Sequence, residues 1–261
     1  HYARLREISP VVRAADGALV LTRYADCQAI LRDPRYGHMP ADMLAFAGFP
    51  DWDEHPALHG LFTSILAINP PDHTRLRRLV SSAFTARRVQ AMRPAVERMV
   101  TGLLDAMDGE VDFVRAFAFP LPVGVIGELL GVPAEDRPQF QKLVRDVSRV
   151  LEVLTPEVLE VADPAAAAIR DYLGALAEER RTAPRDDLMS ALVAAEADGD
   201  RLSHDELITM ASLLFAAGFE TTTNLLSNGV AALLTHPGAT VGDPVAAAEE
   251  LLRYDSPVQL T

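Results

Sequence analysis

The most chemically suggestive feature of this sequence is a polar interruption within a long apolar stretch. In residues 203–236, which have the pattern of one long helix, Gly218, Glu220 and Thr221 stand where packing alone favours leucine. Buried polar groups are costly unless they are satisfied or used. The threonine hydroxyl can bond the carbonyl one turn earlier, the glycine lets a flat or bulky group approach the backbone, and the adjacent carboxyl makes a proton-handling pair. The pattern indicates the wall of a buried reaction site, with a satisfied polar kink between core residues as the alternative.

A second group of residues is suited to binding an anion. His73 and Arg77 are four residues apart, so they share one face of a helix. An imidazole and a guanidinium directed at one spot suit a carboxylate or a phosphate. Six arginines and no acid occur over residues 73–96, at positions 75, 77, 78, 87, 88 and 93. The alternative is a solvated helix face with a basic bias.

Three further sets carry weaker signals. Glu250 and Arg253 are three apart and can pair with each other or hold a loop, although most such pairs lie on the surface. His55 and His59 have metal-ligand spacing, with acids at positions 53 and 54, but a proline lies between them and a surface loop is the better interpretation. The only cysteine, Cys27, is expected to be a small buried hydrophobe.

Composition excludes several classes of function. The net charge is −13, which argues against nucleic-acid binding by bulk charge. One cysteine permits neither an internal disulfide nor a multi-cysteine metal site, which fits a reducing compartment. No apolar run has the length of a membrane span and the first residues have no apolar signal core, so we expect a soluble, cytoplasmic protein with no membrane partner.

The elements that must position these residues are mostly helices in one domain, residues 1–261. A small hairpin is predicted over residues 11–13 and 18–21, around Asp16-Gly17, and residues 37–60 are expected to be irregular or short-helical. A strand is also considered at the extreme C-terminus. Ser203 and Glu206 form a capping box, and Asp243 followed by proline caps the last helix. The predicted helices are 24–32, one starting at 70–72, 89–107, 122–130, 135–154, 163–181, 186–197, 203–236 and 243–253.

Three motifs occur in order: NPPDHTRLRRLV at 69–80, AGFETT at 217–222 and EELLRY at 249–254. Together they resemble a bacterial cytochrome P450, a haem-thiolate monooxygenase, and the likeness runs over residues 10–261. The fold implied is the mainly α-helical P450 fold with a small β-sheet, incomplete at the C-terminus. By this resemblance, His73 and Arg77 bind the haem propionates, and Ala217 and Gly218 line the distal face of the haem.

The same resemblance assigns two further pairs. Glu220 and Thr221 are implied to deliver protons during oxygen activation. Glu250 and Arg253 are implied to be the structural Glu-x-x-Arg pair that steadies the haem-binding core. The implied reaction oxidises a small apolar molecule with O2 and two electrons, and the basic residues are implied to face an acidic redox partner such as a ferredoxin.

The sequence departs from the family pattern in two places. The family's iron ligand is a cysteine in a glycine-rich loop well after the Glu-x-x-Arg helix, whereas Cys27 lies far upstream and does not match that loop. The link over residues 237–249 is also shorter than the usual helix-containing connection. Either the protein is naturally truncated or the chain is part of a longer one, and the chain alone is expected to be inactive.

Two other functions remain open: a catalytically inactive P450-like interaction or activator protein, and a helical metalloprotein that uses His55 and His59. Substrate-facing stretches are predicted at residues 37–60, 152–161 and 213–219, where Leu214, Phe215 and Phe219 either contact substrate or belong to the core. Terpenoids, polyketides, fatty acids or steroids all fit such a lining. With an apolar face left open near residue 217, the isolated chain is expected to be marginally stable or oligomeric.

Overall fold

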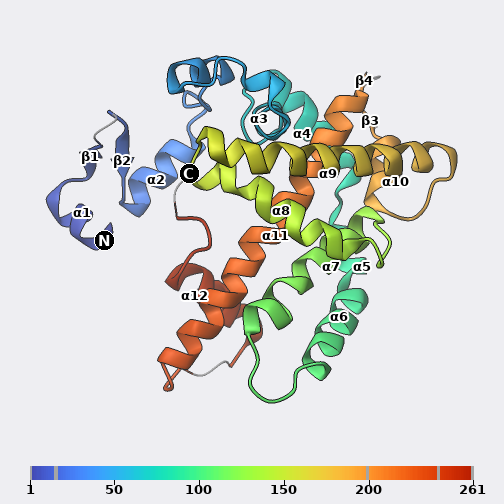
Figure 1. Cartoon of the computed structure of the whole chain (residues 1–261). Coiled ribbons are helices and arrows are strands. Elements are labelled where there is room, and N and C mark those ends of the chain that lie inside the picture. Colours follow the sequence, from blue (N-terminus) through green and yellow to red (C-terminus); the bar gives the residue numbers. More distant parts are fainter. Residues whose placement is uncertain (1, 15–16, 198–199, 240–241, 260–261) are drawn as a thin grey trace. The chain divides into compact units, whose positions relative to one another are not determined.

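The computed structural model describes residues 2–14, 17–197, 200–239 and 242–259. Its backbone contacts divide the chain into two compact units, His1–Met39 and Pro40–Thr261, and each is described by itself. The sequence-based expectation of a mainly helical fold with a small sheet is confirmed in both (Figure 1).

The N-terminal unit is a small hairpin with a helix on either side of it in sequence. It consists of α1 (Tyr2–Ile8), β1 (Val11–Arg13), β2 (Leu19–Leu21) and α2 (Tyr24–Arg32). The strands are antiparallel, and Val12 lies opposite Val20. Gly17 has φ +91°, a left-handed conformation that glycine adopts without strain. Asp16, the other residue of the predicted turn, lies outside the described residues. The hairpin and the helix over 24–32 are as predicted from sequence.

The second unit contains most of the helices. Its elements are η1 (Ala41–Ala47), η2 (Trp52–Glu54), α3 (Pro56–Phe62), α4 (Asp72–Ala83), α5 (Ala86–Ala91), α6 (Arg93–Asp105), the π-helical η3 (Val114–Ala118), α7 (Pro120–Leu130), α8 (Arg137–Glu152), α9 (Pro156–Thr182), α10 (Leu188–Val193), β3 (Glu196–Ala197), β4 (Asp200–Arg201), α11 (His204–Thr235) and α12 (Pro244–Tyr254). The helix α8 packs along α9, and the 32-residue α11 packs on α7, α8 and α9 (Figure 1).

The long helix α11 is central because its N-terminal half is apolar on nearly every side. Ser203 and Glu206 form the predicted capping box: the Glu206 N–H donates to Ser203 Oγ at 3.2 Å and the Ser203 N–H donates to Glu206 Oε2 at 2.8 Å. Phe215 is fully buried and its ring stacks on Phe140 of α8 at 4.6 Å. Phe219 meets Phe119 edge to face at the same centroid distance. These contacts hold the middle of α11 rigidly in the main core.

A second, smaller core joins the segment of residues 41–62 to α9. Its buried members from the early segment are Leu44, Phe49, Ala57 and Leu58, and those from α9 are Leu159, Ala162 and Ala166. The segment of residues 37–60, expected to be irregular or short-helical, is thus short-helical. Its 3₁₀ helices η1 and η2 contribute side chains to this core.

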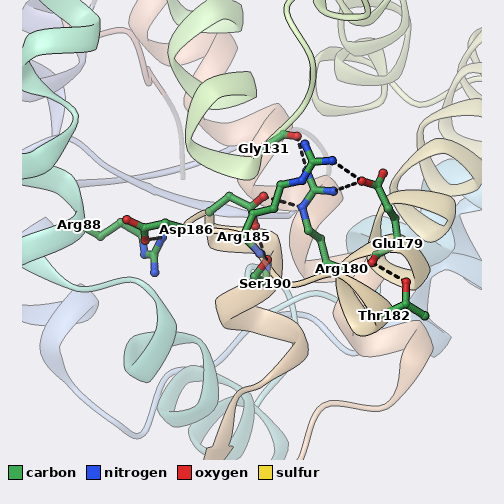
Figure 2. A network of polar contacts seen from close by, with 9 residues as sticks. Arg88, Gly131, Glu179, Arg180, Thr182, Arg185, Asp186 and Ser190 are labelled. Carbon is green, nitrogen blue, oxygen red and sulfur yellow. Dashed lines mark hydrogen bonds and ion pairs between the residues drawn. The ribbon is translucent and has the colours of Figure 1, made fainter.

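A buried ion pair fastens the end of α9 to its neighbours (Figure 2). Arg180 is 1% exposed; its Nε donates to Asp187 Oδ2 at 2.6 Å and one Nη donates to the carbonyl of Gly131 at 2.9 Å. Its other terminal nitrogen lies 2.7 Å from Glu179 Oε1. A buried guanidinium needs such partners because an unpaired charge in the interior is expensive. The network ties together the ends of α7 and α9 and the start of α10.

Proline positions explain two differences from the sequence-based helices. Residues 89–107 form two helices, α5 and α6, and Pro94 occupies the first turn of the second, where its missing N–H costs nothing. The helix predicted to start at Asp163 starts at Pro156, because Thr155 caps it by accepting from the Val158 N–H. Pro164 is then tolerated inside α9.

The region after α9 also differs. The predicted helix over residues 186–197 is limited to α10, and residues 196–197 pair with 200–201 in a short hairpin that the helical pattern did not indicate. Residues 256–259 form no strand, and residues 260–261 lie outside the described part of the chain. Among the described residues, no helix combines the length and apolar character needed to cross a membrane.

Candidate functional site

The polar interruption in α11 has the hydrogen bond predicted for it. The Thr221 hydroxyl donates to the carbonyl of Ala217, one turn earlier, at 2.8 Å. Ala217 is exposed, and Glu220 and Thr221 are half-buried. Spacings of three and four residues put these side chains on one face of the helix. A small side chain, a carboxyl and a hydroxyl therefore lie together on a side of α11 that the core does not cover.

Gly218 is directed elsewhere. A Cβ built on it would lie 3.5 Å from Ile126 Cδ1, so its missing side chain faces α7 of the core. Phe215 and Phe219 are 0% and 3% exposed, so they are core residues here, which was one of the two alternatives for them. On α11 the open face is thus formed by Ala217 and Thr221, and the assignment of Gly218 to a cofactor-facing role stays a prediction.

The predicted anion-binding pair lies on α4, beside the buried face of that helix. The helix buries one stripe of apolar side chains, including the predicted Leu76, Val80 and Ala83. His73 is half-buried and Arg77 is exposed. Neither side chain has a hydrogen-bond or ion-pair partner among the described residues. Two adjacent groups that donate to anions are therefore left without a protein acceptor.

The other arginines of the basic run are largely occupied. Arg88 lies 3.4 Å from the carboxylate of Asp186, and Arg93 lies 3.3 Å from that of Glu97. Arg75 forms an ion pair with Glu206 at the start of α11. The run is thus less of a free basic patch than its sequence indicates. Arg77 and Arg87 have no ion-pair partner within the described part of the chain, and both are exposed.

Glu250 and Arg253 on α12 form the predicted pair. Two nitrogens of the arginine donate to the two carboxylate oxygens at 2.7 and 2.6 Å. These bonds lower the pKa of the Glu250 carboxyl and raise the pKa of the Arg253 guanidinium. Both side chains are exposed. Gly229 of α11 lets Leu251 approach, since a Cβ there would lie 3.0 Å from its Cδ1, and this close packing sets where α12 lies.

An open, mainly apolar pocket of ≈ 410 Å³ lies between the end of α11 and α12. Glu250 and Tyr254 line it from α12, and His236 lines it from the end of α11. The Tyr254 and His236 rings meet edge to face at 5.5 Å. The pocket therefore leaves one side of the predicted structural pair uncovered.

His55 has a structural partner that the sequence did not indicate. Its Nδ1 lies 2.6 Å from Asp163 Oδ2 on α9, and the other oxygen of that carboxylate accepts the Ala57 N–H at 3.0 Å. Asp163 therefore caps α3 from 106 residues away. In the part of the chain that is described, no group of three or more His, Cys, Asp or Glu side chains could hold a metal ion. A metal site at His55 and His59 is therefore not supported.

Cys27 lies in α2 of the N-terminal unit. It is half-buried and its sulfur is 3.5 Å from the carbonyl of Leu21, a local contact within that unit. It is therefore less buried than the small buried hydrophobe that the sequence predicted. No other cysteine occurs in the 261 residues.

Comparison with known proteins accounts for these features together. The family model "Cytochrome P450" matches residues 45–241. The chain is 43% identical over 274 residues to the vitamin D(3) 25-hydroxylase of Pseudonocardia autotrophica, covering 98% of this chain and 64% of that protein. It is 40% identical over 280 residues to the 6-deoxyerythronolide B hydroxylase of Saccharopolyspora erythraea, covering 100% of this chain and 67% of that protein.

Solved structures agree with the sequence relatives. P450BioI, solved in complex with a hexadec-9Z-enoic acid-ligated acyl carrier protein, has a TM-score of 0.87 at 31% identity, covering 100% of this chain and 69% of that one. The cytochrome P450 PksS of Bacillus subtilis 168 has a TM-score of 0.80 at 38% identity, covering 97% and 65%. The chain thus spans about two thirds of the length of the proteins it matches. It belongs to the cytochrome P450 family.

Proposed function

We propose that this chain supplies the distal and propionate-binding parts of a haem-dependent monooxygenase. The observation that carries the proposal is the presence of two features in one chain: His73 and Arg77 on α4, whose side chains have no partner among the described residues, and an uncovered small-and-polar face on α11 around Ala217 and Thr221. The two units are proposed to be parts of one P450 domain, because relatives match them in one continuous alignment.

The residues present suit part of a haem site. His73 and Arg77 would hold its propionates through charge-assisted bonds, and Ala217 would line its distal face. Gly218 fits that role less well, because its missing side chain faces Ile126 of α7. When bound, the haem supplies the activation of O2 with two electrons. A thiolate ligand for the haem iron would not come from Cys27, which lies in α2 and not in a loop after α12.

Glu220 and Thr221 are proposed to handle protons at this face. A hydroxyl has one donor and two acceptor positions. Because the Thr221 proton is directed to the Ala217 carbonyl, its lone pairs remain free to accept from a water molecule. Rotation about the Cβ–Oγ1 bond would then turn the same proton outward. Glu220 is half-buried on the same face and can exchange protons with solvent.

Two relatives are named for hydroxylating vitamin D(3) and 6-deoxyerythronolide B. We extend this to a small apolar molecule as the substrate of this protein. A ferredoxin-type protein is the proposed electron donor, and the exposed Arg87 on α5 supports an acidic partner. We also propose a structural role for the Glu250–Arg253 pair. It would stabilise the contact between α12 and the protein segment that covers the adjoining pocket.

The deciding experiment is a carbon-monoxide difference spectrum of the full-length, reduced protein. The proposal predicts a Soret band of the thiolate type. Its absence, with the protein folded, would contradict a monooxygenase.

The second candidate is a catalytically inactive P450-like interaction or activator protein. This candidate predicts that the 261-residue chain purifies without haem and retains a protein partner. Haem in stoichiometric amount in the purified chain would count against it.

A further inference from the structure

We propose that Arg75 is a positioning residue: through Glu206 it fixes the orientation of α4, and with it His73 and Arg77, relative to α11. The effect of this positioning on haem binding rests on the proposed function. The ion pair itself, and the orientation of α4 that it controls, can be measured without haem.

The contact joins residues 131 positions apart. One terminal nitrogen of Arg75 bonds Glu206 Oε1, and the other lies 3.4 Å from Asp200 Oδ2 on β4. The side chains of Arg75 and Glu206 are only 31% and 25% exposed. Because the two side chains are partly buried, water screens their attraction less than it screens that of a fully exposed pair.

Glu206 is itself held in place. Its second oxygen accepts the Ser203 N–H at 2.8 Å as part of the capping box, so one carboxylate serves both the first turn of α11 and Arg75. The side chain therefore has little freedom to follow a moving α4. The anchor of Arg75 is the rigid start of the same helix that carries Ala217 and Thr221.

Helical geometry turns this anchor into control over orientation. At 3.6 residues per turn, the buried stripe of α4 lies between two flanks. Arg75 is on one flank, and His73 and Arg77 are on the other. The apolar stripe packs against α10 and β3, but apolar contact is non-directional and resists rotation of α4 about its axis only weakly. The directional Arg75–Glu206 ion pair on one flank prevents that rotation. It therefore fixes the positions of His73 and Arg77 on the opposite flank.

The first test measures orientation without haem. Spin labels are placed at two exposed positions, through Ser81→Cys on α4 and Thr222→Cys on α11, in a Cys27→Ser background, and the distance distribution is recorded by pulsed EPR. We expect a narrow distribution that broadens in Arg75→Met and in Glu206→Gln. Arg75→Lys should restore most of the narrow component, and Arg87→Met, an exposed arginine on α5, should leave it unchanged. A distribution that stays narrow in both Arg75→Met and Glu206→Gln overturns the proposal.

The second test measures the consequence. Hemin is titrated into the purified 261-residue chain and followed by its Soret absorbance for wild type, Arg75→Met, Arg77→Met and the double variant. Residues that act through one another are non-additive. If each single change weakens binding about tenfold, the double change should weaken it by well under about a hundredfold. Full additivity overturns the positioning role.

The two tests separate this inference from the proposed function. If the wild-type chain binds no hemin but the label distances depend on Arg75, the proposed haem site is refuted and the control of α4 orientation by Arg75 is supported. Hemin binding by wild type that is indifferent to Arg75→Met, with unchanged label distances, refutes the positioning role and keeps the haem site.

Discussion

Thr221 and Thr235 make the same hydrogen bond on the same helix: each hydroxyl donates to the carbonyl four residues earlier at 2.8 Å. Thr221 does so beside Ala217 on the candidate face, whereas Thr235 does so at the exposed last turn of α11. The two threonines differ in location, and they share this bond, although the Thr235 hydroxyl also lies 3.1 Å from the Ala232 carbonyl and 3.2 Å from His236 Nδ1. This pairing provides an internal control for any role of the Thr221 hydroxyl beyond the helix.

The first prediction uses this control. In the full-length protein supplied with electrons, Thr221→Ala should lower substrate oxidation by about a hundredfold, the lower range for loss of a positioned proton donor. Thr235→Ala should leave it unchanged. Both variants should unfold within about 0.5 kcal/mol of wild type, because each loses only contacts within its own stretch of helix. Product formation per electron consumed is the measurement, and equal losses in the two variants would assign the effect to the helix and not to the hydroxyl.

Gly131 is predicted to be irreplaceable. It has φ +80°, and a Cβ there would lie 2.1 Å from Asp187 Oδ2, the oxygen that holds buried Arg180. Gly131→Ala should therefore lower the free energy of unfolding by about 3 kcal/mol or more, because the ion pair must part to admit the methyl group.

Gly102 in α6 is the matched control for Gly131. Nothing lies within 4 Å of a Cβ built on it, and its φ is not positive. Gly102→Ala should raise the free energy of unfolding by about 0.5–1 kcal/mol, since alanine favours a helix. Urea titration of both variants gives these values, and a Gly131→Ala protein as stable as wild type would show that the Arg180–Asp187 contact is not maintained.

Asp163 is predicted to hold the segment of residues 41–62 onto α9. Asp163→Ala removes the cap of α3 and the partner of His55 together, at a cost of about 1–3 kcal/mol. Amide hydrogen exchange should accelerate in residues 56–62 and remain slow in the main core. Asp171→Ala, an exposed acid two turns further along α9, should change neither. Unaltered exchange in residues 56–62 of Asp163→Ala would mean that the small apolar core suffices to hold the segment.

The Arg75–Glu206 pair predicts a pH dependence of stability. Burial raises the pKa of the Glu206 carboxyl, but the hydrogen bonds from Arg75 and the Ser203 N–H outweigh it, so the pKa lies below its ordinary value of 4.5. A carboxyl with a lowered folded-state pKa stabilises the protein above its unfolded-state pKa, and the benefit is lost as pH falls through the folded-state value. Stability should therefore fall on acidification below about pH 5 by more in wild type than in Glu206→Gln.

Partial exposure limits the size of that effect to about 1 kcal/mol or less. Thermal melts of wild type and Glu206→Gln between about pH 3 and about pH 7 measure it, since this interval brackets the titration of a carboxyl. Parallel curves for the two proteins would show that Glu206 is not ion-paired in solution.

Much of the fold and part of the site followed from the sequence. The capping box at Ser203, the cap at Asp243 and the back-bond of Thr221 all join residues three or four apart, and such bonds depend only on the local helix. The same holds for the Glu250–Arg253 pair. Short-range spacing was therefore enough to place these capped helix starts and to put Thr221, Glu250 and Arg253 on helices, whereas α9 and α10 have other bounds than predicted.

Tertiary structure decided which way those elements face and what they meet. Only the packed helices show that Gly218 faces Ile126, that Asp163 caps α3, and that Arg75 reaches Glu206. The physical reason is that the sequence period fixes side chains relative to one another on a helix, whereas the rotation of that helix is set by apolar burial and by partners more than a hundred residues away.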